Sequence, residues 1–98
     1  MSTGIVYILK FDAPIGTARH SAQFYVGWCK KLSNRVARHR AGNGAAITAH
    51  LVRVGIGFSV VFSCVATPEL EKEIKRYKSI SRWLKSHAHL NNPSLVPV

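Results

Sequence analysis

The segment from Ile5 to Phe11 is rich in β-branched and aromatic residues, and it is largely apolar on both of its faces. In an extended chain successive side chains point to opposite faces, so Ile5, Tyr7 and Leu9 would share one of them. A strand that is apolar on both faces must be covered on both sides. The pattern therefore predicts the central strand of a sheet with other elements packed above and below it.

A second aromatic and branched run, from Gln23 to Trp28, follows after a connection that contains Pro14 and Gly16. This connection, Asp12 to Ala22, is expected to be a loop because proline and glycine interrupt regular structure. Two apolar strands so close in the sequence predict an antiparallel hairpin with a long linking segment.

The rest of the chain predicts helices over residues 32–41 and 45–54, a strand over 58–65 and a final helix over 68–85. Thr67 would cap that last helix and Pro68 would occupy its first position. The predicted class is α/β (α+β): a small three-stranded antiparallel sheet flanked by helices, in the order β-β-α-α-β-α. Residues 1–90 would form one domain, and residues 91–98, without periodicity, a loosely ordered tail.

The charge of the chain is strongly unbalanced, with fourteen Lys and Arg, four Asp and Glu, and a formal net charge of +10. Such a surplus favours a polyanionic partner, because each phosphate contact releases condensed counterions. A solubilising surface charge is the alternative, and an anionic membrane is a weaker one because no convincing amphipathic helix is found. No secretory leader and no apolar run of about 18 residues is seen, so a cytoplasmic location is expected.

Five polar residues lie at particular places on the predicted elements. Tyr7 and Tyr25 lie in the first two strands, Arg35 and His39 are four apart on one helix face, and Glu71 lies near the start of the last helix. The short sequences Gly4-Ile5-Val6-Tyr7, Tyr25-Val26-Gly27, Gly42-Asn43-Gly44-Ala45 and Ala66 to Lys75 surround them. In this order and on these elements, the set resembles the GIY-YIG nuclease family, and specifically its small stand-alone branch. The resemblance covers residues 4 to 86.

The resemblance implies an endonuclease that hydrolyses phosphodiester bonds with one Mg²⁺ or Mn²⁺ ion, held by Glu71. Mg²⁺ keeps most of its waters and takes one or two carboxylates, so a single glutamate is enough. Arg35 would hold the scissile phosphate by a two-pronged contact. Tyr7, with a pKa lowered by the metal and nearby cations, would be the general base, Tyr25 would orient the water or phosphate, and His39 would pass a proton or contact phosphate. The roles of the two tyrosines are interchangeable at this point.

Each residue also has an ordinary structural explanation. The tyrosines could be half-buried strand residues, Arg35 and His39 surface residues, and Glu69 and Glu73 compete with Glu71 for the metal. Cys29 and Cys64 are expected to be inert packing residues. Trp83 and Tyr77 are expected to lie in the core, with a role as base-stacking platforms as the alternative.

The basic residues nearest the proposed site would bind the nucleic-acid backbone: Lys30, Lys31, Arg38, Arg40 and Lys75. Backbone contacts carry no base sequence, so cleavage would follow DNA structure, as in repair, with little sequence specificity. Arg19 and His20 in the long connection could also touch DNA. The alternatives are a catalytically weak or inactive DNA-binding module and an RNA-directed nuclease. A protein partner could supply specificity, because a domain this small has little room for it.

Overall fold

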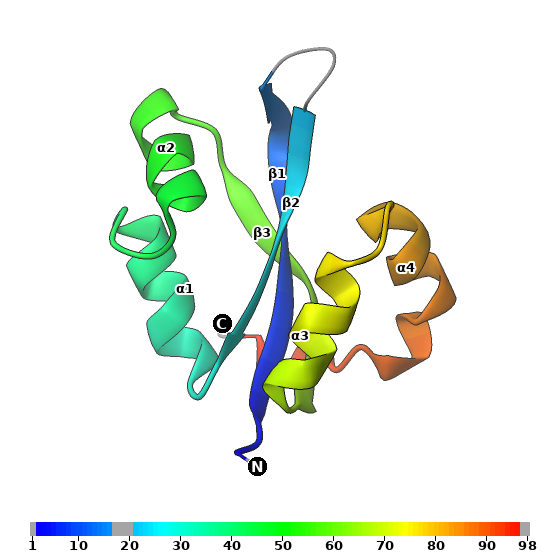
Figure 1. The fold of residues 1–98 in the computed structure, drawn as a ribbon. Helices are drawn as coiled ribbons and strands as arrows, with labels where there is room; N and C mark the ends of the chain where they lie inside the picture. The colour runs from blue at the N-terminus through cyan, green and yellow to red at the C-terminus, as the bar shows by residue number, and fades with distance from the viewer. Residues whose placement is uncertain (1, 17–20, 97–98) are drawn as a thin grey trace.

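The computed structural model describes residues 2–16 and 21–96. Three strands form one antiparallel sheet in the order β2-β1-β3: β1 (Gly4–Gly16), β2 (Ser21–Cys29) and β3 (Phe58–Ala66). The helices α1 (Leu32–Arg40) and α2 (Ala46–Val54) cover one side of the sheet, and α3 (Pro68–Lys75) and α4 (Ile80–Ser86) cover the other (Figure 1). This is the predicted class, and the first strand is the central one, as its two apolar faces require.

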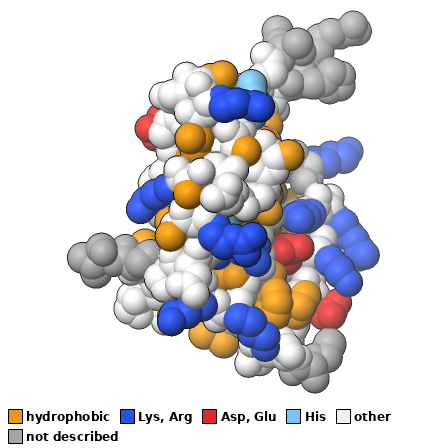
Figure 2. All heavy atoms as spheres, turned by 90° about the vertical axis from the view of Figure 1, so that its left-hand side faces the viewer, with side chains coloured by type: hydrophobic (Ala, Val, Ile, Leu, Met, Phe, Trp, Pro, Cys, Tyr) orange, Lys and Arg blue, Asp and Glu red, His pale blue; other side chains and the backbone are white. Residues whose placement is uncertain are grey.

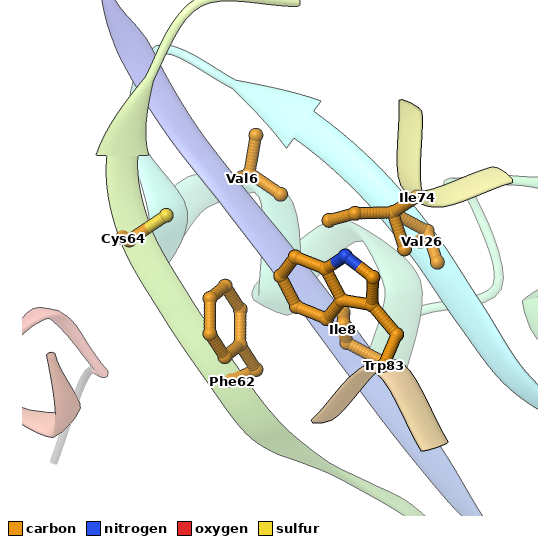
Figure 3. Packing of buried hydrophobic residues seen from close by; sticks show 7 residues of the cluster. All are labelled: Val6, Ile8, Val26, Phe62, Cys64, Ile74 and Trp83. Carbon is orange, nitrogen blue, oxygen red and sulfur yellow. The ribbon is translucent and has the colours of Figure 1, made fainter. Parts of the chain in front are cut away.

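The two faces of β1 belong to two separate cores. Val6 and Ile8 face α3 and α4, where they pack with Val26, Phe62, Cys64, Ile74 and Trp83 (Figure 3). The Trp83 ring meets Phe62 edge-on, with 5.1 Å between ring centroids. Tyr7, Leu9 and Phe11 face the other way, against Leu32, Val36 and Leu51 of α1 and α2. The alternation along one strand therefore decides which side chains can meet α1.

The loop expected from Asp12 to Ala22 is wrong for most of its length. β1 continues to Gly16, β2 begins at Ser21, and pairing resumes with Ile15 opposite Ala22 after a register shift beyond Lys10. Pro14 lies within this shift, where the missing backbone N–H breaks no ladder bond. The connection is therefore a long, irregular hairpin, and Arg19 and His20 fall outside the described residues.

The single last helix expected over 68–85 is also wrong, because the chain leaves the helix after Lys75 and starts again at Ile80. Ser79 caps the second piece, its hydroxyl accepting a hydrogen bond from the Arg82 backbone N–H at 3.2 Å. The break lets both helices follow the twisted sheet, so that Ile74 and Trp83 reach the same core.

The segment after α4 is attached to β3, in contrast to the loose tail expected from Asn91. The Ser63 backbone N–H donates to Asn91 Oδ1 at 2.9 Å, and the Ser63 hydroxyl donates to the Asn92 carbonyl at 2.8 Å. Leu95 packs beside the core that contains Tyr7. In the part of the chain that is described, no helix has the length and apolar character needed to cross a bilayer.

Candidate active site

Tyr7 and Tyr25 lie on the same face of the sheet, on neighbouring strands. Tyr7 pairs with Gly27 and Leu9 pairs with Tyr25, which places both rings on the α1 side. A Cβ atom on Gly27 would overlap the Tyr7 hydroxyl and lie 2.5 Å from the ring carbon that bears it. The glycine after Tyr25-Val26 therefore leaves the space that the Tyr7 ring needs to extend across β2.

The helix α1 brings Arg35 and His39 over these two tyrosines. Leu32 and Val36 fix the helix on the sheet, and His39, one turn after Arg35, is fully buried with them. The His39 ring lies 5.8 Å from the Tyr7 ring and 5.2 Å from the Tyr25 ring, and the Tyr7 oxygen lies 2.7 Å from His39 Nε2. Four of the five predicted catalytic residues are thus assembled from β1, β2 and α1.

The turn between α1 and α2 closes over the other side of His39. A Cβ atom on Gly44 would overlap the imidazole, so the Gly-x-Gly-Ala sequence permits a close backbone approach here. From α2, the buried Thr48 hydroxyl lies 2.8 Å from His39 Nδ1 and donates to the Ala45 carbonyl at 3.0 Å.

One arrangement of protons satisfies every member of this chain. The Thr48 hydroxyl has one proton and gives it to Ala45, so it accepts from His39 Nδ1–H. A neutral imidazole protonated on Nδ1 presents a lone pair on Nε2. Tyr7 therefore donates its phenolic proton to His39, and the chain runs from Tyr7 through His39 to Thr48.

The two titratable members of this chain are held neutral. Burial and then the positive charges of Arg35 and Arg38 lower the pKa of His39 to about 4. Burial and then the neighbouring Tyr25 raise the pKa of Tyr7, while Arg35 acts in the opposite direction through its charge and its contact with the hydroxyl. The protein's own groups thus raise this pKa on balance, where the sequence suggested a lowered one.

Arg35 lines two hollows on this side of the sheet. One, of about 230 Å³, is lined by Tyr25, Arg35, Arg38, Gly44 and Ala45. The other, of about 270 Å³, is lined by Trp28, Cys29, Lys30, Lys31, Asn34, Arg35 and Arg38. Figure 2 shows this side of the molecule, where basic side chains far outnumber acidic ones. The guanidinium of Arg35 therefore lies where an anion could approach Tyr25, which lines the first hollow.

Three of the predicted backbone-binding residues line these hollows: Lys30, Lys31 and Arg38. Lys30 also extends over the Trp28 ring at 5.5 Å, and Trp28 donates to the Ala66 carbonyl at 2.9 Å. Arg40 is exposed at the end of α1, outside the lining of either hollow, and Lys75 lies on α3.

Glu71 is not among the residues that line these two hollows. It lies on α3, whose Ile74 packs in the core on the opposite face of the sheet, although α3 also contacts β2 and β1. Its carboxylate pairs with Lys75 Nζ at 3.3 Å, and its side chain is 21% exposed. Among the described residues, no three His, Cys, Asp or Glu side chains cluster as metal ligands. Glu71 alone fits an ion that keeps most of its waters.

Thr48 and Asn34 are site residues that sequence reasoning missed. Asn34 lies on an exposed helix position with nothing to mark it. Thr48 had a signal, because it is a polar residue on the face of α2 that also carries the buried Leu51. A polar side chain on a packing face usually has a buried partner, and here the partner is His39.

The chain matches no known protein-family model, no curated protein and no solved structure. The resemblance to GIY-YIG nucleases therefore depends on the motif residues and on the positions described above.

Proposed function

We propose that this protein is a GIY-YIG-type endonuclease that hydrolyses phosphodiester bonds in DNA, directed by DNA structure more than by sequence. The observation that carries the proposal is the buried Tyr7–His39–Thr48 hydrogen-bond chain beneath Tyr25 and Arg35, next to two basic hollows. Buried proton-transfer groups beside an arginine at an open surface suit hydrolysis of an anionic substrate. A cytoplasmic location and a role in DNA repair accompany this proposal.

The geometry suggests how a neutral tyrosine can serve as the base. Arg35 binds the non-bridging oxygens of the scissile phosphate and offsets their developing charge. Tyr7 accepts a proton from the attacking water as it gives its own phenolic proton to His39 Nε2. The water oxygen forms the new bond to phosphorus, and the bond to the leaving sugar oxygen breaks. That oxygen keeps the electron pair and takes a proton from solvent, and no free tyrosinate is required. Tyr25, at the mouth of the hollow, orients the water or the phosphate.

A divalent ion, Mg²⁺ or Mn²⁺, would supply charge stabilisation at the phosphate and the leaving oxygen when bound. Glu71 is the residue that would hold it, after exchanging its contact with Lys75 for the ion. The exposed Glu73 on the same helix provides a matched control for this assignment.

The test is nicking of a supercoiled plasmid with Mg²⁺, with and without EDTA. We expect Arg35→Ala and His39→Asn each to reduce the rate by about 10²–10³-fold, as removal of a charge-stabilising or proton-transfer group does.

Glu71→Ala should lose activity at low Mg²⁺, whereas Glu73→Ala should cut like the parent. Equal cleavage by Glu71→Ala and the parent would rule out the metal role of Glu71. Full activity in Arg35→Ala would refute the site.

The second candidate is a DNA-binding module without useful catalysis. It is favoured by the Glu71–Lys75 ion pair and by the position of α3 over the opposite sheet face. Tight, salt-sensitive DNA binding with no turnover under any divalent metal would support this candidate. Matched DNA and RNA substrates in the same assay separate DNA cleavage from RNA cleavage.

A further inference from the structure

A third hollow lies on the other side of the sheet, where α3 ends and α4 has not yet begun. It encloses about 350 Å³ and is lined by Arg76, Tyr77, Lys78, Ser79 and Arg82. Because the chain is not helical between α3 and α4, the Tyr77 ring and the neighbouring cations Arg76 and Lys78 face one concave surface. We call it the α3–α4 hollow.

The charges and exposure of this hollow are unusual for a helix junction. Three of its five residues are cationic, and among the described residues none of the three forms a salt bridge. Tyr77 is 47% exposed, in contrast to the fully buried Tyr7 and to the core position that the sequence suggested. An aromatic ring that adds nothing to a core and lies among unpaired cations is placed for a ligand with both flat rings and negative charge.

We infer that the α3–α4 hollow binds a single-stranded segment of nucleic acid, with one base stacked on Tyr77. Arg76, Lys78 and Arg82 would then contact the flanking phosphates. Stacking on an exposed aromatic side chain beside basic residues is the general mode of single-strand binding, because every base has a flat face. In a duplex, neighbouring base pairs cover the faces of each base. A duplex would therefore contact the basic side chains through its phosphates but could not stack a base on Tyr77.

The position of the hollow relates it to the candidate active site. A neighbouring hollow of about 370 Å³ shares Lys78 and Ser79 with the α3–α4 hollow. Its other lining residues are Pro14, Ile80, Ser81 and the first residues of β2, from Ser21 to Phe24. β2 is an edge strand of the sheet, and its later residues, Tyr25 and Trp28, line the hollows around Arg35. A strand leaving that site can therefore pass around the β2 edge to Tyr77.

The dimensions allow such a path. The shortest principal extent of the molecule is 23 Å, which about seven nucleotides would span at ~3.4 Å each. This path depends on the proposed function, whereas stacking on Tyr77 does not require cleavage. The inferred substrate is accordingly a duplex that carries a single-stranded arm.

The test is fluorescence anisotropy with a labelled oligothymidylate of about eight nucleotides and with a short blunt duplex, both without divalent metal. Tyr77→Ala should weaken single-strand binding by about 5- to 100-fold and leave duplex binding within twofold. Tyr77→Phe should keep the parent affinity, because stacking needs the ring and not the hydroxyl. The exposed position of Tyr77 allows both variants to fold, which circular dichroism checks.

Unchanged single-strand binding by Tyr77→Ala would overturn the inference, as would an equal loss for both nucleic acids. Plasmid nicking by the same variants separates it from the proposed function. If Tyr77→Ala loses single-strand binding, the inference is supported whatever the nicking assay shows. If Arg35→Ala still cuts the plasmid, only the proposed active site is refuted.

Discussion

At the scale of single residues, the candidate site depends on two glycines as much as on its polar side chains. Gly27 has no side chain, so the Tyr7 ring can cross β2 and place its oxygen 2.7 Å from His39 Nε2. Gly44 does the same for the imidazole on the other side. Each motif glycine thus defines the position of a chemical group on another element.

We expect Gly27→Ala to damage the site through Tyr7. Its Cβ atom would displace the Tyr7 ring, and overpacking of this kind costs about 1–3 kcal/mol. Urea denaturation should show that loss, and plasmid nicking should fall with it. Gly57→Ala, a strand-entry position whose added Cβ would meet only the Asp12 side chain, is the control. Parent-like stability and nicking in Gly27→Ala would contradict this account of the motif.

His39 predicts how stability depends on pH. Its pKa in the folded protein is about 4, below its ordinary value of 6.5, so the unfolded chain takes up a proton first as the pH falls. The contribution of neutral His39 is therefore complete above about pH 6.5 and is lost progressively down to about pH 4. We expect the free energy of unfolding to fall on the order of 2–3 kcal/mol across this window.

Urea denaturation at several pH values measures this slope. The informative quantity is the difference in slope between the parent and His39→Asn. The variant should lose most of the slope between pH 6.5 and pH 5. A slope that is the same in both proteins would mean that folding leaves the pKa of His39 unchanged.

At the scale of secondary-structure elements, the sequence predicted which faces are buried, but not the register shift in the hairpin or the break between α3 and α4. The apolar faces of Ile5 to Phe11 predicted the central strand, and the glycines predicted where α1 and α2 end. The extension of the hairpin to Gly16 was hidden, because Pro14 interrupts the pattern while pairing resumes beyond it. The break after Lys75 was hidden too, since residues 76–79 include the good helix formers Arg76 and Lys78 and no glycine or proline.

The attachment of the segment after α4 gives a prediction at this scale. Asn91 accepts a hydrogen bond from the backbone N–H of the fully buried Ser63, at the outer edge of β3. Asn91→Ala leaves that donor without a partner, which costs about 1–3 kcal/mol. Thermal and urea denaturation should detect this loss, whereas the exposed Ser94→Ala should change stability by less than about 0.5 kcal/mol. A silent Asn91→Ala would mean that the segment is loosely held.

At the scale of the whole molecule, the net charge of +10 indicated a polyanionic partner but not where it would bind. The sequence pattern named Tyr7, Tyr25, Arg35 and His39, and these four lie together. Glu71 lies on α3, which packs on the opposite face of the sheet. A late helix can cover either face, and sequence spacing does not choose between them. Thr48 was missed because its partner His39 is on another helix.

The arrangement of charge predicts the salt dependence of duplex binding. Each phosphate contact adds about 0.9 to the slope of log affinity against log salt. Replacing Lys30, Lys31 and Arg38 with glutamine should therefore lower the slope by up to about 3. The same loss of charge at exposed positions outside these hollows, as in Lys10→Gln, Arg53→Gln and Lys85→Gln, should change it far less. Equal slopes for the two triple variants would indicate that binding follows net charge alone.

The Tyr7–His39–Thr48 hydrogen-bond chain ends at Thr48, and this has a consequence for the order of steps in a catalytic cycle. In the arrangement described above, the buried Thr48 gives its only proton to the Ala45 carbonyl, so no proton leaves through that end. A proton that reaches His39 must return through Tyr7 to the same mouth by which the substrate came in. The proton and the cleaved strand would then leave through the same opening. Regeneration of the base and release of the product would therefore occur one after the other.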